Sequence, residues 1–355
     1  MILVNNPGDW SRTFSPLLHA EWNGWTPTDL IFPFFLFVLG VAIPFAFAAR
    51  IERSGGDLGP TYRQIVRRTI ILFTLGLVLN WFPFFDVDWA TARIPGVLQR
   101  IALVYLFASL AYLNLGKLGR AWLSVGLLLG YWLAMILVPV PGFGAGDLGP
   151  DGNLAAWVDS QVLGPHVWRY APGPGDPEGI LSTLPAIVTA LAGIFTGEWL
   201  RSPRSQSDKL IGLFVWGSIA TGAGVFFGYF FPVNKNLWNS SYVVLTAGLA
   251  LTLLAVIYYV VDIHGRDVWA RPFVVFGTNA IAVFVSSSLA AKILYKIRWT
   301  GVDGATITLK TWLYDHFFAA WIPDNAASLA WATVHVIFWW AIMNLLYRKK
   351  IFIKI

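Results

Sequence analysis

The chain has 355 residues, of which 57% are hydrophobic and only 12% are charged, and its mean hydropathy is +0.62. Soluble globular domains carry about twice that share of charged residues, so the composition excludes an ordinary soluble protein. The formal net charge of +6 belongs to the loops and suits anionic lipid or phosphate and not nucleic acid, and the lack of cysteine excludes disulfides, thiol catalysis and thiolate metal sites.

Long apolar runs recur along the whole chain and predict an all-α fold, a polytopic membrane helical bundle of about ten spans. An outer-membrane barrel would instead show segments of about ten alternating residues. The chain opens with an apolar stub at 1–6, which we interpret as the end of a truncated first span. The other predicted spans lie at 28–50, 65–85, 95–114, 121–140, 180–200, 209–231, 238–262, 272–295 and 325–347. We expect a single transmembrane domain over 1–355.

Three stretches depart from simple apolar spans. Asn279 lies inside the span 272–295, where its amide needs a polar partner. Segment 306–321 has mixed polarity and predicts an interfacial or re-entrant helix. The longest loop, 141–179, is rich in Gly, Pro and Asp, and loops of this length are usually functional or disordered. Its indoles would suit pyranose rings and its carboxylates would suit sugar hydroxyls; a surface loop without a ligand is the equal alternative.

The distribution of basic residues predicts the orientation of the chain in the membrane. Sixteen of the 25 lysines and arginines fall in one alternate set of loops and in the C-terminal tail: Arg50, Arg53, Arg63, Arg67, Arg68, Lys117, Arg120, Arg201, Arg204, Lys209, Arg266, Arg271, Arg348, Lys349, Lys350 and Lys354. We therefore expect this side, with the C-terminus, to be cytoplasmic, and His19 to face outward. The expected location is a bacterial inner (cell) membrane.

The run from His19 to Asp29 places an imidazole, two carboxylates, an amide and two indoles at the start of the first long span. An imidazole titrates near neutral pH, so His19 can accept a proton from a substrate or attack it directly. We count Glu21, Trp22 and Asn23 as candidates for binding the substrate. Asp29 is a candidate for orienting His19 or binding an amine, although it also fits a helix-capping box. The alternative for the whole run is a set of interfacial anchors.

Three further motifs contain candidate ligand-binding residues. Asn5 and Asn6 supply amide donors for a developing oxyanion. In Arg93-Ile-Pro-Gly-Val-Leu-Gln-Arg100, the second arginine lies about two turns inside a span, at a depth where a cation needs a partner. That partner is either a phosphate or carboxylate of a ligand or an acidic side chain of the protein. In Asp176-Pro-Glu178-Gly, Glu178 either caps a helix or binds a polyol.

The segment 232–240 carries more hydrogen-bonding groups than a turn requires, with Asn234, Lys235, Asn236 and Trp238 close together. We count the first three as candidates for binding a cofactor and Trp238 as a candidate for binding the substrate. The histidines are scattered and no residues have metal-ligand spacing, so we expect no metal.

Taken in order, these segments resemble the membrane acetyltransferases of the heparan-alpha-glucosaminide N-acetyltransferase family, including its bacterial members. The strings that carry the resemblance are Val4-Asn5, His19-Ala20-x-Trp22-Asn23-Gly24, Thr26-x-x-Asp29-Leu30 with Phe32-Pro33, Arg93-Ile-Pro-Gly-Val-Leu-Gln-Arg100, Asp176-Pro-Glu178-Gly179 and Pro232-Val-Asn-Lys-Asn-Leu-Trp238. They extend from the start of the chain to about residue 300. Members of the family begin with a complete first helix that carries an Asp-x-x-Arg-Gly type motif, which the printed sequence lacks.

The resemblance implies transfer of acetyl from cytosolic acetyl-CoA to the amino group of a terminal glucosamine on the far side of the membrane. It implies that His19 is the active-site histidine and Asn5 the asparagine that accompanies it. His19 would act either as a base or as an acetyl carrier. The residues that we expect to bind acetyl-CoA are Arg93, Arg100, Asn6, Asn234, Lys235 and Asn236. The expected partners are an amino-sugar or glycan acceptor, membrane lipid and, in a homodimer, a second copy of the chain.

Two other classes of function fit the same residues. An amino-sugar transporter would line a pathway with them, and broken helices or internal repeats would favour it. An O-acyltransferase of an envelope polysaccharide would use the same donor but form an ester.

Overall fold

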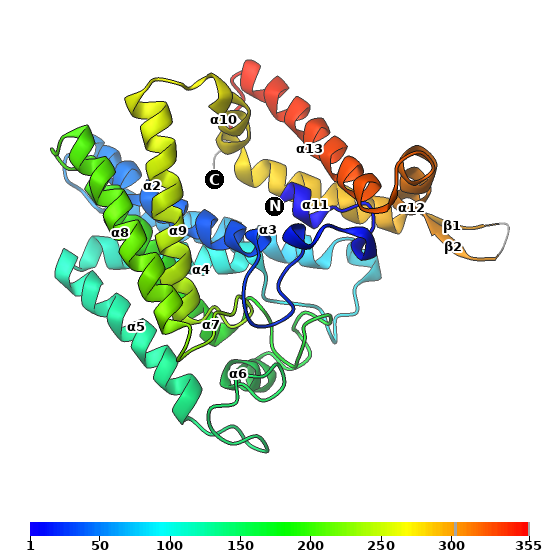
Figure 1. Ribbon diagram of the computed structural model, residues 1–355, viewed down its shortest axis with the longest axis horizontal. Helices are drawn as coiled ribbons and strands as arrows, with labels where there is room; N and C mark the ends of the chain where they lie inside the picture. Colours follow the sequence, from blue (N-terminus) through cyan, green and yellow to red (C-terminus); the bar gives the residue numbers. More distant parts are fainter. Residues whose placement is uncertain (302–303, 354–355) are drawn as a thin grey trace. The chain divides into compact units, whose positions relative to one another are not determined.

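The computed structural model describes residues 1–301 and 304–353, which are mostly helical, as predicted (Figure 1). Within this part of the chain, seven helices are long and apolar enough to cross a membrane, or eight if one bent pair counts as a span. The seven are Pro27–Arg53, Val97–Asn114, Lys117–Leu137, Ile180–Arg201, Gln206–Phe227, Ser240–Ile263 and Asp324–Arg348. The chain is therefore a multi-pass membrane protein of the all-α class.

Every apolar run predicted as a span is helical, but fewer than the ten expected meet the criteria for crossing a membrane. Helix α3, Gly59–Trp81, has 23 residues and is not among the seven. Its first half carries Arg63, Arg67 and Arg68, which lower the hydropathy of any long window over that half. The stub at the start of the chain is the short helix α1, Ile2–Asn5.

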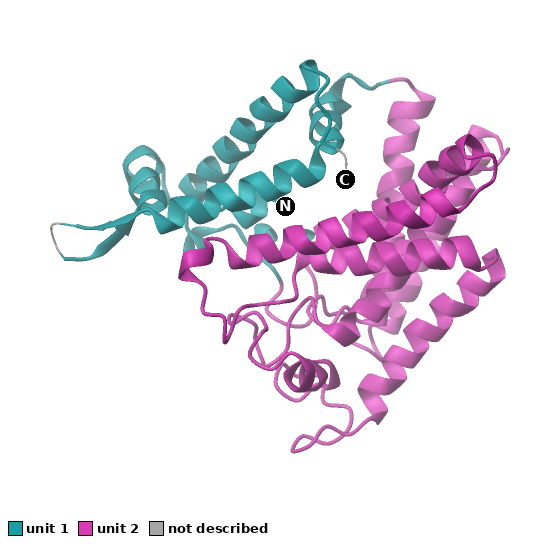
Figure 2. Ribbon diagram, turned by 180° about the vertical axis from the view of Figure 1, so that it is seen from behind, with its two compact units in different colours: residues 1–19, 26–28, 266–355 teal, residues 20–25, 29–265 magenta. Residues whose placement is uncertain are grey.

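The chain forms two compact units (Figure 2). Unit 1 comprises residues 1–19, 26–28 and 266–355, and unit 2 comprises residues 20–25 and 29–265. The single transmembrane domain expected over the whole chain stays a prediction.

Unit 2 is a bundle of long helices. Its elements are the second half of η3 Pro27–Leu30, α2 Ile31–Arg53, α3, η4 Phe84–Asp86, α4 Val97–Asn114, α5 Lys117–Leu137, α6 Leu154–Val162, α7 Ile180–Arg201, α8 Gln206–Phe227, α9 Ser240–Tyr258 and the π-helical turn η5 Tyr259–Ile263. Helices α2 and α7 approach closely at two glycines. A Cβ on Gly40 would lie 2.0 Å from the carbonyl oxygen of Ala190, and a Cβ on Gly193 would lie 2.0 Å from the carbonyl oxygen of Phe37, so neither position has room for a side chain. Small residues permit this kind of contact between membrane helices.

The segments that precede α2, α4, α7 and α9 meet at one end of unit 2. The backbone amide of Gly24 donates to the carbonyl of Val233 over 2.7 Å, and that of Ile94 donates to His166 over 3.0 Å. The indole N–H of Trp22 donates to the carbonyl of Leu148 over 2.9 Å. Hydrogen bonds therefore join residues that lie in four different loops of the sequence.

The long loop 141–179 contains a helix that was not predicted. This is α6, nine residues long, whose N-cap Asn153 accepts a hydrogen bond from the Ala156 amide over 2.8 Å. The loop is thus a folded part of unit 2, packed against α5 and α7.

Unit 1 corrects two predictions. Its elements are α1, η1 Trp10–Arg12, η2 Ser15–Leu17, η6 Val268–Ala270, α10 Arg271–Thr278, α11 Ala280–Lys296, β1 Arg298–Thr300, β2 Thr306–Thr308, α12 Leu309–Tyr314, the π-helical turn η7 Asp315–Ala319 and α13 Asp324–Arg348. The span predicted at 272–295 is broken, because α10 and α11 bend by 71° at Asn279. The segment 306–321 is a strand paired antiparallel with β1, followed by α12 and η7, and not a single helix.

The side chain of Asn279, at the break between α10 and α11, has the polar partners that were predicted. The side-chain N–H of Asn279 donates to the carbonyl of Ile351 over 3.1 Å, and its oxygen accepts the amide of Ile353 over 2.8 Å. The C-terminal tail therefore satisfies the polar group at the bend.

Candidate functional site

An ion-paired cluster joins the segment before α4 to the segment before α7. Nε of Arg93 donates to Oδ2 of Asp176 over 2.7 Å, and Nη2 donates to Oδ1 of Asp176 and to Oε2 of Glu178, each over 2.6 Å. Burial lowers the pKa of Arg93, but its bonds to the two carboxylates outweigh this effect and the pKa is raised. The cluster fixes the two loops across 83 residues of sequence.

Asp159 on α6 organises the turn that contains Asp176. Its Oδ2 accepts the backbone amide of Asp176 over 3.0 Å, and its Oδ1 accepts that of Ile180 over 2.9 Å. Burial raises the pKa of Asp159, and the two amides oppose that shift. Asp159 is not among the predicted site residues, although Asn153 before the apolar run at 154–158 is a signal for a capped helix.

Arg100 on α4 is a buried cation with incomplete hydrogen bonding. It is 1% exposed; its Nη2 donates to the hydroxyl of Ser182 and to the carbonyl of Gly179, the latter over 3.2 Å. Its guanidinium lies over the indole of Trp238, 5.1 Å from the ring centre. Nε and Nη1 are buried and have no hydrogen-bond partner in the part of the chain that the structure describes. An anionic or carbonyl oxygen of a ligand would fit these two nitrogens.

Trp238 is held in the interior by a strained turn. The backbone φ of Trp238 is +50°, a left-handed conformation that costs a non-glycine residue about 1–3 kcal/mol. Buried Asn234 helps to hold the turn, since its Oδ1 accepts the amide of Leu237 over 3.0 Å. The indole is 1% exposed, donates to Oγ1 of Thr189 over 3.2 Å and packs edge-on against Phe32. The indole of Trp238 is therefore surrounded by side chains of unit 2, and the guanidinium of Arg100 lies over one face of the ring.

The residues before Trp238 connect to the segment that precedes α2. Lys235 lies 3.7 Å from Oδ1 of buried Asp29, whose Oδ2 accepts the amide of Ala20 over 3.0 Å. The side-chain amide nitrogen of Asn234 donates to Oδ1 of Asn23 over 3.3 Å. Burial lowers the pKa of Lys235, and the carboxylate of Asp29 opposes this shift.

The structure therefore brings most of the predicted site residues to one end of unit 2. They are Trp22, Asn23, Asp29, Arg93, Arg100, Glu178, Asn234, Lys235, Asn236 and Trp238. Glu21 belongs to the same unit and is exposed. Arg93 and Glu178, predicted to bind different ligands, bond to each other.

Three predicted residues belong to unit 1. Asn5 and His19 are exposed, and the side chain of Asn6 donates to the carbonyl of Ile2 over 2.8 Å. Within the described ranges, no group of three or more potential metal-ligating side chains could hold an ion.

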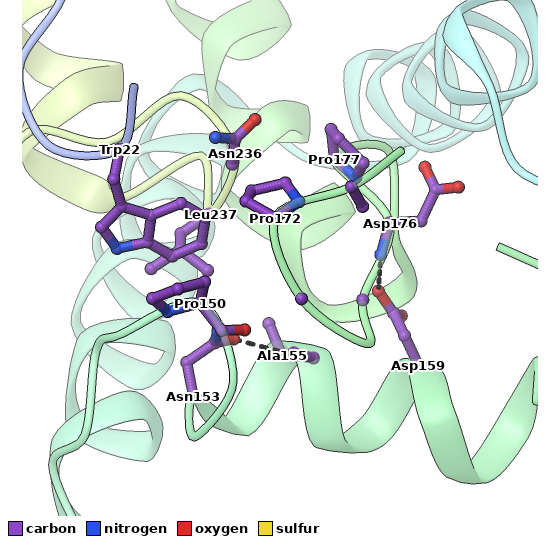
Figure 3. A pocket seen from close by; sticks show the side chains of 14 residues that line it. Trp22, Pro150, Asn153, Ala155, Asp159, Pro172, Asp176, Pro177, Asn236 and Leu237 are labelled. Carbon is purple, nitrogen blue, oxygen red and sulfur yellow. Dashed lines mark hydrogen bonds between the residues drawn. The ribbon is translucent and has the colours of Figure 1, made fainter. Parts of the chain in front are cut away.

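A small pocket lies beside the cluster in unit 2 (Figure 3). Its lining joins the long loop to the segments before α2 and α9, and includes Trp22, Pro150, Pro172, Asp176 and Asn236.

Comparison with known proteins agrees with the motifs. A family model described as a domain of unknown function, DUF5009, matches residues 11–148. Heparan-alpha-glucosaminide N-acetyltransferase of Homo sapiens is 30% identical over an alignment of 410 positions, which covers all of this chain and 58% of the human protein. The Mus musculus protein of the same name is 27% identical with the same coverage. The chain thus spans little more than half the length of the curated relatives that it matches. The homology confirms the resemblance of this chain to the heparan-alpha-glucosaminide N-acetyltransferases.

Proposed function

We propose that the protein is a membrane N-acetyltransferase that moves acetyl from acetyl-CoA to the amino group of a glucosamine-type sugar. The observation that carries this proposal is the meeting, at one end of unit 2, of three strings that are far apart in sequence: 93–100, 176–179 and 232–238. Together they hold a buried guanidinium with two nitrogens free of protein partners in the described structure. The names of the human and mouse relatives supply the reaction.

His19 is the proposed base. An ammonium group must lose a proton before its nitrogen can attack, and an imidazole accepts protons near neutral pH. The nitrogen then bonds to the acetyl carbon, the carbon–sulfur bond breaks, and the thiolate takes up a proton to leave as CoA thiol. In the two-step alternative, the imidazole nitrogen attacks first and carries the acetyl group to the amine. The roles expected for Asn5 and Asn6 at the thioester oxygen, and for Asp29 with the imidazole or ammonium, are part of this proposal.

Arg100 is the proposed contact to an oxygen of acetyl-CoA. Two nitrogens of a buried cation that have no hydrogen-bond partner in the described structure favour a negatively polarised oxygen, and the guanidinium lies over the ring of Trp238. Asn234 and Lys235 would contribute by holding that turn and the Asp29 carboxylate, instead of touching the donor themselves.

For orientation, we propose that the end of unit 2 that holds these strings is extracytoplasmic and that the C-terminus is cytoplasmic, in a cell membrane of a bacterium. The positive-inside bias supports this, because α2 and α7 end in Arg53 and Arg201 while α5 begins at Lys117.

Purified protein in detergent or nanodiscs, incubated with labelled acetyl-CoA and glucosamine, tests the function. We expect an amide product with the intact protein and a loss of at least about 100-fold in rate for His19→Ala. His316→Ala is the matched control, since it removes another exposed imidazole. Full activity of His19→Ala contradicts the base, an ester product supports an O-acyltransferase, and uptake into proteoliposomes without acetylation supports a transporter.

A further inference from the structure

A second buried arginine in unit 2 has donors to spare. Nη2 of Arg120, in the first turn of α5, donates to Oε1 of Glu198 on α7 over 2.7 Å. Nε and Nη1 of Arg120 are buried and have no hydrogen-bond partner among the described residues. The guanidinium lies over the rings of Tyr112 and Phe195, 5.0 Å and 5.6 Å from their centres. Two of its three nitrogens are therefore available to an anionic oxygen from outside the chain.

The charges around Arg120 do not balance. Arg120, Arg201 and Glu198 all lie near the phenol of Tyr112, so this cluster holds two guanidinium groups and one carboxylate. Lys117, three residues before Arg120 on the same helix, is exposed and adds a further positive charge. A cluster with excess positive charge between the ends of membrane helices favours an anionic ligand.

The start of α5 favours an anion for a second reason. The N-cap residue of α5 is Gly116, which has no side chain with which to bond the first backbone amides of the helix. Backbone amides at a helix N-terminus, together with the helix dipole, stabilise negative charge. Arg120 and Lys117 lie in this same first turn, so the side chains and the backbone favour the same kind of ligand.

The depth of the cluster in the membrane identifies the ligand as a lipid. Glu198 comes 18 residues after Ile180, the first residue of α7, and at a rise of about 1.5 Å per residue it lies roughly 27 Å along the helix. That distance is close to the thickness of the hydrocarbon core of a bilayer. Leu118 and Trp122, two residues before and after Arg120, are 71% and 67% exposed, as expected for side chains that face lipid. Arg120 therefore lies at the level of lipid headgroups, at the end of α7 opposite to the candidate functional site.

We propose that Arg120, Lys117 and the N-terminus of α5 bind the phosphate of an anionic phospholipid. Glu198 limits the affinity, because its carboxylate occupies one nitrogen of Arg120 and repels a phosphate. The side chain of Glu198 is 24% exposed and that of Arg120 is 5% exposed, so the ion pair reaches the surface of unit 2 at the carboxylate. This lipid site is separate from acetyl transfer and adds a binding function to the protein.

The test is native mass spectrometry of the purified protein with phosphatidylglycerol and, as the zwitterionic reference, phosphatidylcholine. The intact protein should bind phosphatidylglycerol with a Kd about tenfold below that for phosphatidylcholine. Arg120→Gln should abolish this preference, and Lys117→Gln should weaken it by about fivefold. Arg53→Gln is the matched control, because it removes an exposed arginine at the end of α2, and it should change the Kd by less than about twofold.

Glu198→Gln separates lipid binding from a purely structural ion pair. Its amide oxygen can still accept from Arg120 while the repelling charge is gone, so this variant should bind phosphatidylglycerol about threefold more tightly. A loss of stability cannot produce such a gain. Equal Kd values for the two lipids, or weaker binding in Glu198→Gln, would overturn the proposal. Displacement of phosphatidylglycerol by inorganic phosphate or CoA at millimolar concentration would assign the cluster to a soluble anion and also overturn it.

Discussion

Replacing Arg100 with methionine separates ligand binding from stability. If the two unpaired nitrogens of Arg100 meet an oxygen of acetyl-CoA, Arg100→Met removes at least one charge-assisted hydrogen bond, worth about 1.5–3 kcal/mol. At 1.36 kcal/mol for each factor of ten, kcat/KM for acetyl-CoA should fall by about 10- to 150-fold. The assay is the initial rate of acetyl transfer as a function of acetyl-CoA concentration at saturating acceptor.

Stability should change little in the same variant. Removing the charge relieves the cost of burying a cation with incomplete partners, and such replacements are neutral or stabilising by about 1–4 kcal/mol. The lost bond to Ser182 and the lost contact with Trp238 oppose this by about 2 kcal/mol. Arg120→Met is the contrast, since Arg120 is also buried but bonds to Glu198 over 2.7 Å, so its removal should destabilise the fold. A large loss of thermal stability in Arg100→Met with unchanged kcat/KM would refute the reasoning and make the guanidinium structural.

Three further substitutions test the packing and the charges of unit 2. Arg93→Met strands two carboxylates and should destabilise the protein by about 3–5 kcal/mol in a thermal-unfolding assay, whereas exposed Arg169→Met should have no measurable effect. Gly40→Ala forces a methyl group against a carbonyl of α7 and should lower the free energy of unfolding by about 1–3 kcal/mol. Gly126→Ala, with open space around it, should leave stability unchanged or raise it. Equal effects of the two substitutions would contradict the close packing of α2 and α7. The pKa of Lys235 is lower in the folded protein than in the unfolded chain, so the folded state binds fewer protons. The free energy of unfolding should therefore rise with pH as the unfolded pKa of 10.5 is approached. Lys235→Met should flatten that rise, and parallel pH profiles of the variant and the intact protein would contradict the argument.

The long helices were predictable because a long apolar run carries its signal locally. Other features depend on distant residues. Nothing near Asn279 distinguishes a satisfied amide from a bend, since its partners come from the C-terminal tail more than 70 residues later. The short apolar run of α6 was obscured by the surrounding glycine and proline.

The site was predictable by residue type and not by pairing. The sequence marked Arg93 and Glu178 as polar groups at membrane edges, but their separation of 85 residues gave no indication that they neutralise each other. Arg100 and Trp238 were likewise assigned to different ligands, while the structure stacks them. Whether a buried charge meets a ligand or a protein group depends on the fold, which sequence spacing does not specify.

The glycine at 179 joins the long loop to the buried arginine, and its substitution tests that link. A Cβ on Gly179 would lie 1.9 Å from Oδ2 of Asp159, the oxygen that accepts the amide of Asp176. The carbonyl of Gly179 also accepts from Arg100. Gly179→Ala must therefore displace either the carboxylate or the turn, and should lower both thermal stability and kcat/KM.

A double-mutant cycle with Asp159→Ala distinguishes this clash from a general loss of flexibility. Removing the carboxylate alone should destabilise the turn by about 1–3 kcal/mol, because one buried and one partly buried backbone amide lose their acceptor. In the double variant the added methyl group has room, so the combined loss should be smaller than the sum of the single losses by about 1 kcal/mol or more. Strict additivity would mean that Gly179 is needed for its own backbone conformation, and that α6 does not control the position of the carbonyl that Arg100 binds.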